Sequence, residues 1–411
     1  MNDIIITADI LLPISSKPLY KSAIAISDGV IINIGNPEDI INKYPDSEII
    51  RKDNCIILPG FINAHTHLEL GWIKNKLGGF NNFIEWLEQI IIAKRNVIDR
   101  ETISEAVKHG VETLIESGVT TVGEISSYNG IDKELLKNSG LRTVLFVEIF
   151  DWNLNLLDEN TFENNDIFEE RPFPHAPYSC SPQTLDKVFT FSRENNIPLS
   201  IHLAESTDEV NFLKNLSNGF ETRIFPLLQK ENFTRIYSES PTSYISKFNK
   251  DNSSKYTAVH MVQLNENDLN IIKNRNVGIV LCPRSNLLLK VGNPRFDLLK
   301  EIEYIGIGTD GLSSNYNLNF FEEIRALHNL LLESNMDKDT FRTIYYSTLG
   351  GAKALFLDDK TGSIEVGKQA DLICLNFGNE IPVDPYLFVI SSDNKNLEFS
   401  MVNGRFLFNK H

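Results

Sequence analysis

Between residues 57 and 311 the chain repeats one arrangement, in which a short apolar segment typical of a strand precedes a stretch with helical spacing. We interpret eight segments as strands: ILPGFINAH (57–65), VTTVGEI (119–125), RTVLFVEIF (142–150), RPFPHAPYS (171–179), PLSIHLAE (198–205), YTAVHMV (256–262), VGIVLCPRS (277–285) and YIGIGTDG (304–311). Residues 101–118 between two of them predict an amphipathic helix that ends at a glycine. Strands alternating with helices favour a parallel sheet, and eight such units favour an α/β fold of the (β/α)₈ TIM-barrel type.

Both ends of the chain consist instead of short β-rich runs separated by turns. Residues 22–35 (SAIAISDGVIINIG) predict a hairpin, because Asp-Gly suits the positive φ angles of a two-residue turn. Residues 362–377 and 397–411 have the same pattern, and neither end offers enough strands for a stable sheet of its own. We therefore expect residues 1–57 and 358–411 to form one small β-sandwich domain, and residues 58–357 to form the barrel.

Charge and hydropathy argue against several kinds of partner. Acidic residues outnumber basic ones by 55 to 39, and the net charge of −16 disfavours nucleic acid or an anionic membrane surface. No apolar run approaches the roughly 18 residues that a membrane span needs, and the N-terminal stretch lacks the basic region of a signal peptide. The four cysteines are far apart in the sequence. We expect a cytoplasmic protein that acts on a small molecule, either alone or as a homo-oligomer.

Polar side chains with metal-binding or acid–base chemistry stand at the ends of the predicted strands. In chain order they are His65, His67, His175, His202, Glu205, His260 and Asp310. Five of the eight histidines are in this set, whereas the others lie in helical patterns or at the C-terminus. Because active-site residues of such barrels lie at the carboxyl ends of the strands, we expect these side chains to meet at the barrel mouth.

The His65-Thr66-His67 sequence predicts a metal site. Residues i and i+2 of a strand point to the same face, so both imidazoles would project into the mouth. Two imidazoles at this spacing suit a borderline cation such as zinc, and a third imidazole and a carboxylate would complete the site, with His202 and Asp310 as the natural candidates. A water molecule on such a metal has its pKa lowered to about 7, which provides a hydroxide nucleophile at neutral pH.

Each of these residues also has a purely structural interpretation when it is taken alone. An isolated His-x-His pair is often without function, and Asp310 before a glycine suits a turn. Glu205 suits the N-terminus of a helix, and His175 suits a loop between prolines. The metal interpretation depends on the joint occurrence of these residues at strand ends.

These motifs give the chain a close resemblance to the amidohydrolase superfamily, in the group with cytosine deaminase, S-adenosylhomocysteine deaminase and the triazine chlorohydrolases. The stretches that carry it, in the family's order, are PGFINAHTHLE, HAPYSCSP, IHLAES, VHMVQLNENDL, CPRSNLLL, IGTDGLSSN and GSIEVGKQADLICLN. The resemblance covers essentially the whole chain. It implies one divalent metal ion, zinc or alternatively iron, bound by His65, His67, His202 and Asp310.

The resemblance also implies roles for the remaining residues. Glu205 would move protons between the nucleophilic water and a ring nitrogen, His260 would orient the hydroxide, and Asp310 would also accept a proton from the water. Binuclear members of the superfamily place a carboxylated lysine at the end of the fourth strand, where this chain reads RPFPHAPYS without a lysine. That difference favours a single metal ion and ring deamination, with His175 as a substrate ligand.

The segment after His67 is expected to set the substrate. FIEWLEQII (83–91) is similar to deaminases of adenine nucleosides, in particular the aminodeoxyfutalosine deaminases of the futalosine route to menaquinone. Glu85 would then accept the ribose hydroxyls and Trp86 would wall the pocket, although a helix with Trp86 in the core and Glu85 in solvent explains the pattern equally well. Residues 206–255, rich in aromatic and basic side chains, are predicted to form a lid.

The expected activity is hydrolytic deamination of a 6-aminopurine nucleoside with release of ammonia. The resemblance places aminodeoxyfutalosine first among substrates and S-adenosylhomocysteine or methylthioadenosine second. A deaminase of guanine or a pterin, or a chlorohydrolase, is the alternative within the same group. A non-catalytic amidohydrolase-like scaffold is the alternative from another class, and it is disfavoured because all the expected metal ligands and Glu205 are present.

Overall fold

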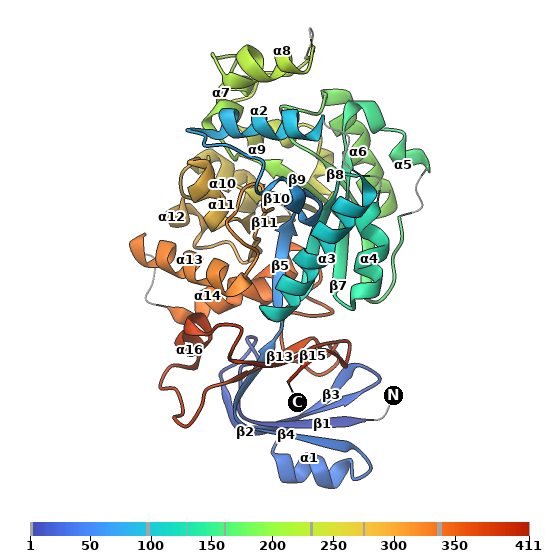
Figure 1. The fold of residues 1–411 in the computed structure, drawn as a ribbon, viewed down its shortest axis with the longest axis vertical. Helices are drawn as coiled ribbons and strands as arrows, with labels where there is room; N and C mark the ends of the chain where they lie inside the picture. The colour runs from blue at the N-terminus through green and yellow to red at the C-terminus, as the bar shows by residue number, and fades with distance from the viewer. Residues whose placement is uncertain are drawn as a thin grey trace.

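The protein consists of a barrel and a separate β-sheet stacked end to end (Figure 1). Both termini lie in the sheet, and the central part of the chain forms the barrel. The computed structural model describes residues 3–95, 99–128, 130–159, 162–230, 233–273, 276–334 and 339–410.

Eight strands form the barrel sheet, and every neighbouring pair in it is parallel. The strands are β5 (Phe61–Thr66), β6 (Val119–Ser126), β7 (Arg142–Ile149), β8 (Phe168–Pro174), β9 (Leu199–Leu203), β10 (Tyr256–His260), β11 (Val277–Leu281) and β12 (Ile305–Ile307). They coincide with the eight predicted segments, and their order in the sheet is β8-β7-β6-β5-β12-β11-β10-β9. The predicted eight-stranded parallel barrel is therefore confirmed.

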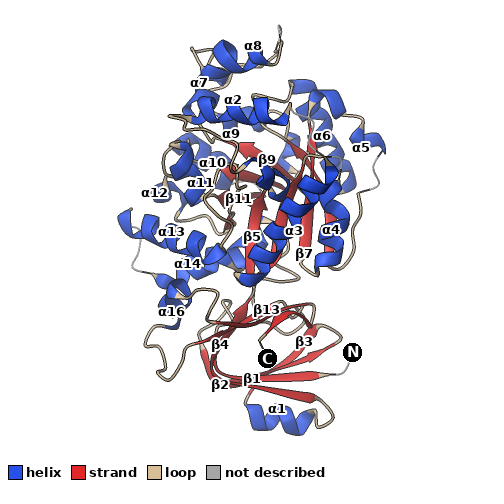
Figure 2. Cartoon of the chain, in the orientation of Figure 1, coloured by secondary structure: helices blue, strands red, loops and turns tan. Residues whose placement is uncertain are grey.

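The two ends of this sheet approach each other and nearly close the barrel. β8 packs against β9, and the backbone N–H of His202 donates to the carbonyl oxygen of His175 at 3.1 Å. Ile62, Val144, Phe173 and other buried side chains fill the interior. All strands run in the same direction, so their carboxyl ends share one rim, on the side away from the β-sheet (Figure 2).

Helices surround the barrel and follow its strands (Figure 2). The larger ones are α3 (Arg100–Glu116), α4 (Ile131–Ser139), α6 (Pro182–Asn195), α10 (Glu266–Lys273), α11 (Pro283–Leu289), α13 (Phe320–Glu333) and α14 (Thr340–Ser347). The predicted helix at 101–118 corresponds to α3, whose N-cap Asp99 accepts from the N–H of Thr102. None of the helices within the described ranges is long and apolar enough to cross a membrane.

Two further groups of helical elements lie at the mouth of the barrel. α2 (Phe83–Lys94) follows β5 and begins after its N-cap Asn82. The other group follows β9 and consists of α7 (Thr207–Leu213), the π-helical turn η3 (Phe220–Ile224), α8 (Phe225–Leu227) and α9 (Pro241–Ile245). η3 packs against α2, and this group lies over the end of the barrel in Figure 1. That the segment opens and closes as a lid stays a prediction.

The second sheet combines strands from both ends of the chain. Its order is β15-β14-β13-β4-β1-β2-β3. The strands are β1 (Ile4–Leu11), β2 (Leu19–Ser27), β3 (Val30–Gly35), β4 (Glu48–Pro59), β13 (Leu372–Asn376), β14 (Leu397–Val402) and β15 (Arg405–Asn409). β1 and β4 pair in parallel and the other pairs are antiparallel, so the sheet is mixed. The expectation that the two ends of the chain build one β-unit is confirmed.

This sheet curls around a small core of its own. Ile6, Ile24 and Phe399, which come from different strands, are buried in one apolar cluster. The Asp28-Gly29 turn has positive φ at both residues, as the sequence predicted. It meets the β14–β15 turn so closely that a Cβ on Gly29 would lie 2.2 Å from Oδ1 of Asn403. The limits of the two units at residues 57 and 358 stay a prediction.

The sheet continues directly into the first barrel strand. β4 ends at Pro59 and β5 begins at Phe61, so Gly60 alone connects the two units at this point. Its N–H donates to the carbonyl oxygen of Asp371 at 3.0 Å, and a Cβ at this position would lie 2.1 Å from the Thr120 side chain. Only glycine permits this close approach between the sheet and the barrel.

A buried ion pair joins the bottom of the barrel to the sheet. Nε of Arg142, the first residue of β7, lies 2.6 Å from Oδ2 of Asp371, and the side chains are 3% and 0% exposed. The guanidinium also binds Asp371 Oδ1, Gln369 and the carbonyl oxygen of Asp166. Asp371 in turn accepts from the N–H of Asn403 at 2.8 Å. The pair therefore ties both parts of the protein together with its hydrogen-bonding groups satisfied.

Replacing Arg142 by Met would leave the Asp371 carboxylate buried without its cation. We expect Arg142→Met to lower the free energy of unfolding by about 3–5 kcal/mol, measured by urea denaturation followed by circular dichroism. Lys187→Met is the control, because its ion pair with Asp158 is solvent-exposed and should leave the unfolding midpoint nearly unchanged. Equal effects of the two substitutions would contradict the proposed importance of the buried pair.

Candidate active site

The predicted metal ligands and acid–base residues come from the rim where the barrel strands end. His65 lies in β5 and His67 just beyond it, His202 lies in β9, and His260 is the last residue of β10. Asp310 follows β12 by three residues, and its N–H donates to the carbonyl oxygen of His65 at 3.1 Å. Because β5 and β12 are neighbours in the sheet, Asp310 is placed beside the two histidines of the first strand.

The backbone bends sharply at several of these strand ends. Ala204, His260, Met261 and Asp310 have φ angles of 54°, 76°, 47° and 55°. Residues other than glycine rarely adopt this left-handed conformation, which costs about 1–3 kcal/mol each and clusters at functional sites. The bends turn the chain at the rim, where the polar side chains project into the barrel mouth.

Three imidazoles converge at one point of the mouth. Nε2 of His202 lies 3.3 Å from Nε2 of His65 and 3.4 Å from Nε2 of His67. In a tetrahedral zinc site with Zn–N bonds of about 2.0–2.1 Å, ligand nitrogens are about 3.3–3.4 Å apart. The spacing of the three nitrogens therefore fits a single metal ion of this kind.

The protonation state of the imidazoles also suits a metal. Burial lowers the pKa of His65, His67 and His202 well below its usual value, and neighbouring charged groups lower it further. All three rings are therefore neutral at pH 7 and have a lone pair to offer. A shared cation would accept the lone pairs of all three Nε2 atoms at once, which is the usual role of neutral imidazoles gathered in this way.

Asp310 completes this group with a carboxylate. Its Oδ1 lies 3.8 Å from Nε2 of His65 and 3.6 Å from Nε2 of His67. The hydroxyl of Ser285 donates to Oδ2 at 2.7 Å, and the N–H of Gly311 donates to Oδ1 at 2.9 Å. These hydrogen bonds favour the ionised carboxylate and hold its orientation. The donor set is three nitrogens and one oxygen, which is typical of zinc sites.

Gly308 makes the approach of Asp310 to the first strand possible. A Cβ on Gly308 would lie 2.5 Å from the carbonyl oxygen of His65 and 2.9 Å from its Cβ. Any side chain there would push β12 away from β5, and Asp310 would move with it.

His260 faces the same space from β10. Its Nδ1 lies 3.1 Å from Oδ1 of Asn286, so Nδ1–H donates to the amide oxygen and Nε2 keeps a lone pair. Burial lowers the pKa of His260, which keeps the ring neutral. Nε2 lies 3.6 Å from Oε1 of Glu205, too long for a hydrogen bond, so both groups are available to a bound molecule.

Glu205 is a buried carboxyl group that favours its protonated form. Burial, followed by the charges of Asp310 and Glu209, raises the pKa of Glu205 well above its usual value. The Glu209 carboxylate accepts from the N–H groups of Ala204 and Glu205 at 3.1 and 2.9 Å, and so holds this turn of the chain. Glu205 is thus a positioned proton donor beside the histidine group.

His175 lies just after β8, next to His202. The Ser179 hydroxyl donates to the carbonyl oxygen of Ala176, so its oxygen accepts from Nδ1–H of His175 at 2.7 Å. Nε2 is left as an acceptor, 3.9 Å from Oε1 of Glu148. Burial lowers the pKa of His175 to about 4, so the ring is neutral. The Nε2 lone pair of His175 thus faces the cavity, whereas the Nε2 atoms of His65, His67 and His202 face one another.

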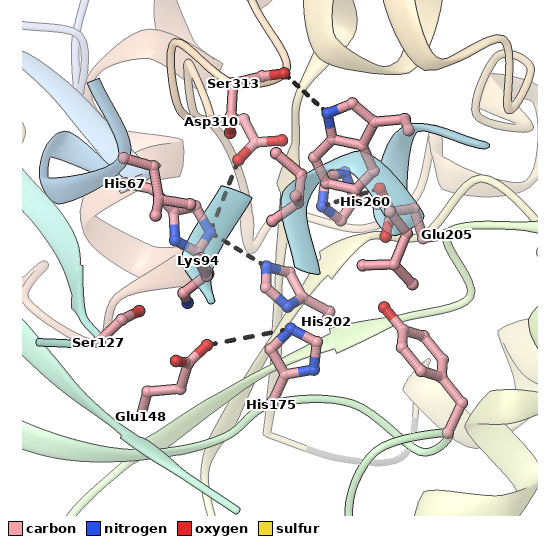
Figure 3. Close-up of a pocket in the computed structure, with 15 residues that line it drawn as sticks. His67, Lys94, Ser127, Glu148, His175, His202, Glu205, His260, Asp310 and Ser313 are labelled. Atoms are coloured by element: carbon pink, nitrogen blue, oxygen red, sulfur yellow. Dashed lines mark hydrogen bonds and ion pairs between the residues drawn. The ribbon is translucent and has the colours of Figure 1, made fainter. Parts of the chain in front are cut away.

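A cavity connects these groups to the helices over the mouth (Figure 3). Its lining includes His67, Leu70, Trp86, Leu87, Ile90, Lys94, Ser127, Glu148, His175, Tyr178, His202, Glu205, His260, Asp310 and Ser313. Trp86 donates through Nε1 to the carbonyl oxygen of Ser313 at 2.7 Å, which fixes its ring against the loop after β12. Phe220 of η3 stacks on Tyr178, with ring centroids 4.0 Å apart. The segment after β9 therefore helps to cover the cavity.

Glu85 does not lie in this lining, in contrast to Trp86, the other predicted substrate contact on α2. Its carboxylate accepts from the N–H and the amide of Asn81 at 2.8 and 3.1 Å, and it lies 3.8 Å from the Arg223 guanidinium. The side chain is 29% exposed. In this conformation Glu85 binds Asn81, just before the start of α2, and does not reach the cavity.

Several residues of the site were not singled out from the sequence. Glu148, Ser127 and Lys94 line the cavity, and Ser285 and Asn286 hold Asp310 and His260. The sequence could have marked Glu148 as a site candidate, because it is a charged residue near the end of the otherwise apolar run VLFVEIF. Nothing in the sequence marks Lys94 in this way, since a lysine in the last turn of a helix is ordinary.

The model of the amidohydrolase family matches residues 56–407, so the chain belongs to this family. An aminodeoxyfutalosine deaminase of a Nitratiruptor species is 31% identical over 392 residues, which cover 90% of this chain and 91% of the relative. A 5'-deoxyadenosine deaminase of Methanococcus aeolicus is 30% identical over 398 residues, 92% of this chain and 87% of the relative. The resemblance inferred from the motifs is thereby confirmed.

A solved structure is similar over nearly the whole chain. The crystal structure of Helicobacter pylori aminofutalosine deaminase in complex with methylthio-coformycin has a TM-score of 0.85 and 27% sequence identity, and covers 98% of this chain and 100% of that chain. The barrel and the terminal sheet are therefore shared with an enzyme of the same family.

The converging nitrogens predict binding of one equivalent of zinc. We expect His202→Ala to weaken zinc affinity at least about 100-fold, because one of three short-spaced imidazole ligands is lost. The measurement is competition against a chromogenic chelator after the protein has been stripped of metal. His109→Ala is the matched control, since His109 is an exposed residue of α3 and should leave zinc affinity unchanged. Unchanged affinity in His202→Ala would contradict the assignment.

Proposed function

We propose that this protein is a metal-dependent deaminase of 6-aminopurine nucleosides. The observation that carries the proposal is the placement of Glu205, a buried carboxyl group with a raised pKa, in one cavity with His67, His202 and Asp310, next to the three converging imidazoles. Replacement of a ring amino group by oxygen needs an activated water, a proton for the ring nitrogen and a proton for the leaving ammonia. The relatives named as deaminases of aminodeoxyfutalosine and 5'-deoxyadenosine support the same reaction.

The metal site would be formed by His65, His67, His202 and Asp310. A divalent ion bound there, zinc in this proposal, supplies the Lewis acidity that lets water attack at neutral pH. Asp310 takes one proton from the attacking water as its oxygen bonds to C6 of the purine. The lone pair on Nε2 of His260 accepts a hydrogen bond from the same water and orients it.

Glu205 supplies the proton balance at the ring. Its carboxyl group donates a proton to N1 while the C6–O bond forms, which relieves the negative charge that attack would leave on the ring. Asp310 then passes its proton to the amino group, and the C6–N bond breaks with release of ammonia. Glu205 recovers a proton from the new hydroxyl group at C6, which becomes the carbonyl of the product. Both carboxyl groups end in their starting protonation states.

The remaining cavity residues would hold the nucleoside. Trp86 packs as a flat wall against the purine, and the Nε2 lone pair of His175 accepts a hydrogen bond from a sugar hydroxyl. For Glu85 to accept the ribose hydroxyls, as the resemblance implies, its carboxylate must first release the N–H of Asn81.

Aminodeoxyfutalosine is the first candidate substrate, and 5'-deoxyadenosine is the second. The first is favoured by the 31% identity with the Nitratiruptor enzyme over nine tenths of both chains. The second is favoured by the Methanococcus relative at 30% identity. S-adenosylhomocysteine and methylthioadenosine belong to the same chemical class. A place in the route to menaquinone follows only if aminodeoxyfutalosine is the substrate.

The test of the proposed function is a substrate panel with the zinc-loaded protein. We expect ammonia release, with conversion of the adenine absorption band to that of hypoxanthine, for at least one of the four nucleosides. Ammonia from guanine or a pterin only, or chloride from a chlorinated triazine, would assign the protein to another activity of the family. No product from any of these compounds would favour a non-catalytic scaffold.

Glu205→Gln tests the proton transfer. We expect kcat to fall about 10²–10⁴-fold, because the amide can no longer exchange a proton with N1. Zinc content and nucleoside affinity should be retained, measured by metal analysis and by calorimetry. Glu112→Gln on the exposed face of α3 is the matched control. Full turnover in Glu205→Gln would rule out the assigned role.

A further inference from the structure

Lys94 brings a positive charge to a cavity whose other lining residues are neutral or acidic. It is the last residue of α2, and it shares one face of the helix with Trp86 and Ile90, because these residues are four positions apart. All three line the cavity. With a rise of 1.5 Å per residue, the eight positions from Trp86 to Lys94 span about 12 Å of its roof.

Trp86 and Lys94, at the two ends of this helix face, lie at different parts of the site. Trp86 is bound to Ser313, in the loop that also carries Asp310. Lys94 lies beside Ser127 and Glu148 in the close-up, on the side of the cavity formed by the ends of β6 and β7 (Figure 3). A molecule whose purine contacts Trp86 and Glu205 would therefore extend its sugar and 5' substituent along α2 toward Lys94.

The charge of the Lys94 ammonium group interacts at longer range with the buried Glu69 carboxyl, but no carboxylate of the described residues lies in ion-pair contact with it. Among the residues that the structure describes, it makes neither an ion pair nor a hydrogen bond, and its contact is with the ring face of Tyr128, 5.3 Å from the centroid. Its charge nevertheless faces the site, since Lys94 lines the same cavity as His67 and His175. Because Lys94 is half-buried, an anion placed beside it would interact more strongly than at an exposed lysine.

We propose that Lys94 binds a carboxylate carried by the 5' substituent of the substrate and thereby selects acidic over neutral adenine nucleosides. This inference rests on the proposed function. It separates the candidate substrates by charge, because 5'-deoxyadenosine and methylthioadenosine have no carboxylate, whereas aminodeoxyfutalosine and S-adenosylhomocysteine each have one. The carboxylate is on an aryl ring in aminodeoxyfutalosine and on an amino acid in S-adenosylhomocysteine. The two carboxylates have the same charge, but they lie at different distances from the purine, and only the amino acid has an ammonium group beside its carboxylate.

The decisive comparison is between a carboxylated substrate and its methyl ester, which removes the charge and keeps the shape. We expect Lys94→Met to lower kcat/KM for aminodeoxyfutalosine at least tenfold, mainly through KM, and to change kcat/KM for its methyl ester less than about threefold. Lys94→Arg should recover most of the loss. S-adenosylhomocysteine is the second carboxylated substrate in this test. A tenfold loss of kcat/KM for this substrate alone in Lys94→Met would identify the amino-acid carboxylate as the group bound.

Lys74→Met is the matched control, because it removes one lysine charge from the exposed surface close to the same helix. It should leave all rates unchanged. Raising the ionic strength should weaken binding of the acid more than that of the ester in the wild type, and this difference should disappear in Lys94→Met.

Equilibrium binding distinguishes failure of this inference from failure of the proposed function. Calorimetry of the zinc-loaded wild type and Lys94→Met with the acid and the ester reports the charge preference whether or not turnover occurs. Equal losses for acid and ester would show that Lys94 acts only in packing and would overturn the inference. Deamination of neutral nucleosides only, or no binding of the acid by the wild type, would overturn it as well. Binding of the acid with Lys94-dependent selectivity but without ammonia release would retain the inference and reject the deaminase reaction.

Discussion

The hydrogen bond from His202 N–H to the carbonyl oxygen of His175 joins the two ends of the barrel sheet, and the site depends on this closure. β8 and β9 are the outer strands of the sheet, and between them they carry one expected metal ligand and one expected substrate contact. Without closure, His202 would be separated from His175 by the full width of an open sheet, although the strands β12, β11 and β10 would still link it to β5. The 3.3 and 3.4 Å distances from Nε2 of His202 to those of His65 and His67 therefore follow from the barrel topology as well as from the choice of residues.

Burial then determines which groups in the mouth carry charge. It lowers the pKa of the imidazoles and raises that of Glu205, whereas hydrogen bonds from Ser285 and Gly311 favour an ionised Asp310. The surroundings thus shift the pKa values of two carboxyl groups in one cavity in opposite directions. This difference is what a reaction needs when one group must donate a proton while the other accepts one.

Strand periodicity was sufficient to predict the barrel, because each of the eight strands is a compact apolar run followed by a turn. The expected metal ligands were visible for the same reason, since a polar residue at the end of such a run is conspicuous. Lys94 reaches the cavity only because α2 lies across the mouth, and no local pattern specifies where a helix after a long loop will pack. Trp86 was expected at the pocket from the family resemblance, and it does line the cavity. Asn286 and Ser285 were present in the CPRSNLLL motif, but their contacts depend on the relative placement of β10, β11 and β12.

The role of Glu85 could not be predicted from its position in the sequence. A glutamate at the start of a helix can accept a hydrogen bond either from a ligand or from the backbone N–H groups that precede the helix. In the structure, Asn81 supplies that N–H.

The position of β4 in the middle of the terminal sheet has a consequence for synthesis of the chain. β4 pairs with β1 on one side and with β13 on the other, and β13 leaves the ribosome only after all the described barrel strands. Until then one edge of a long strand, continuous with the strand that carries His65, has unpaired backbone groups. Such an edge attracts other strands, so the nascent chain is most prone to misassociate during the time in which the barrel is being completed. The C-terminal strands thus protect the N-terminal ones, and removing β13 to β15 would expose that edge permanently.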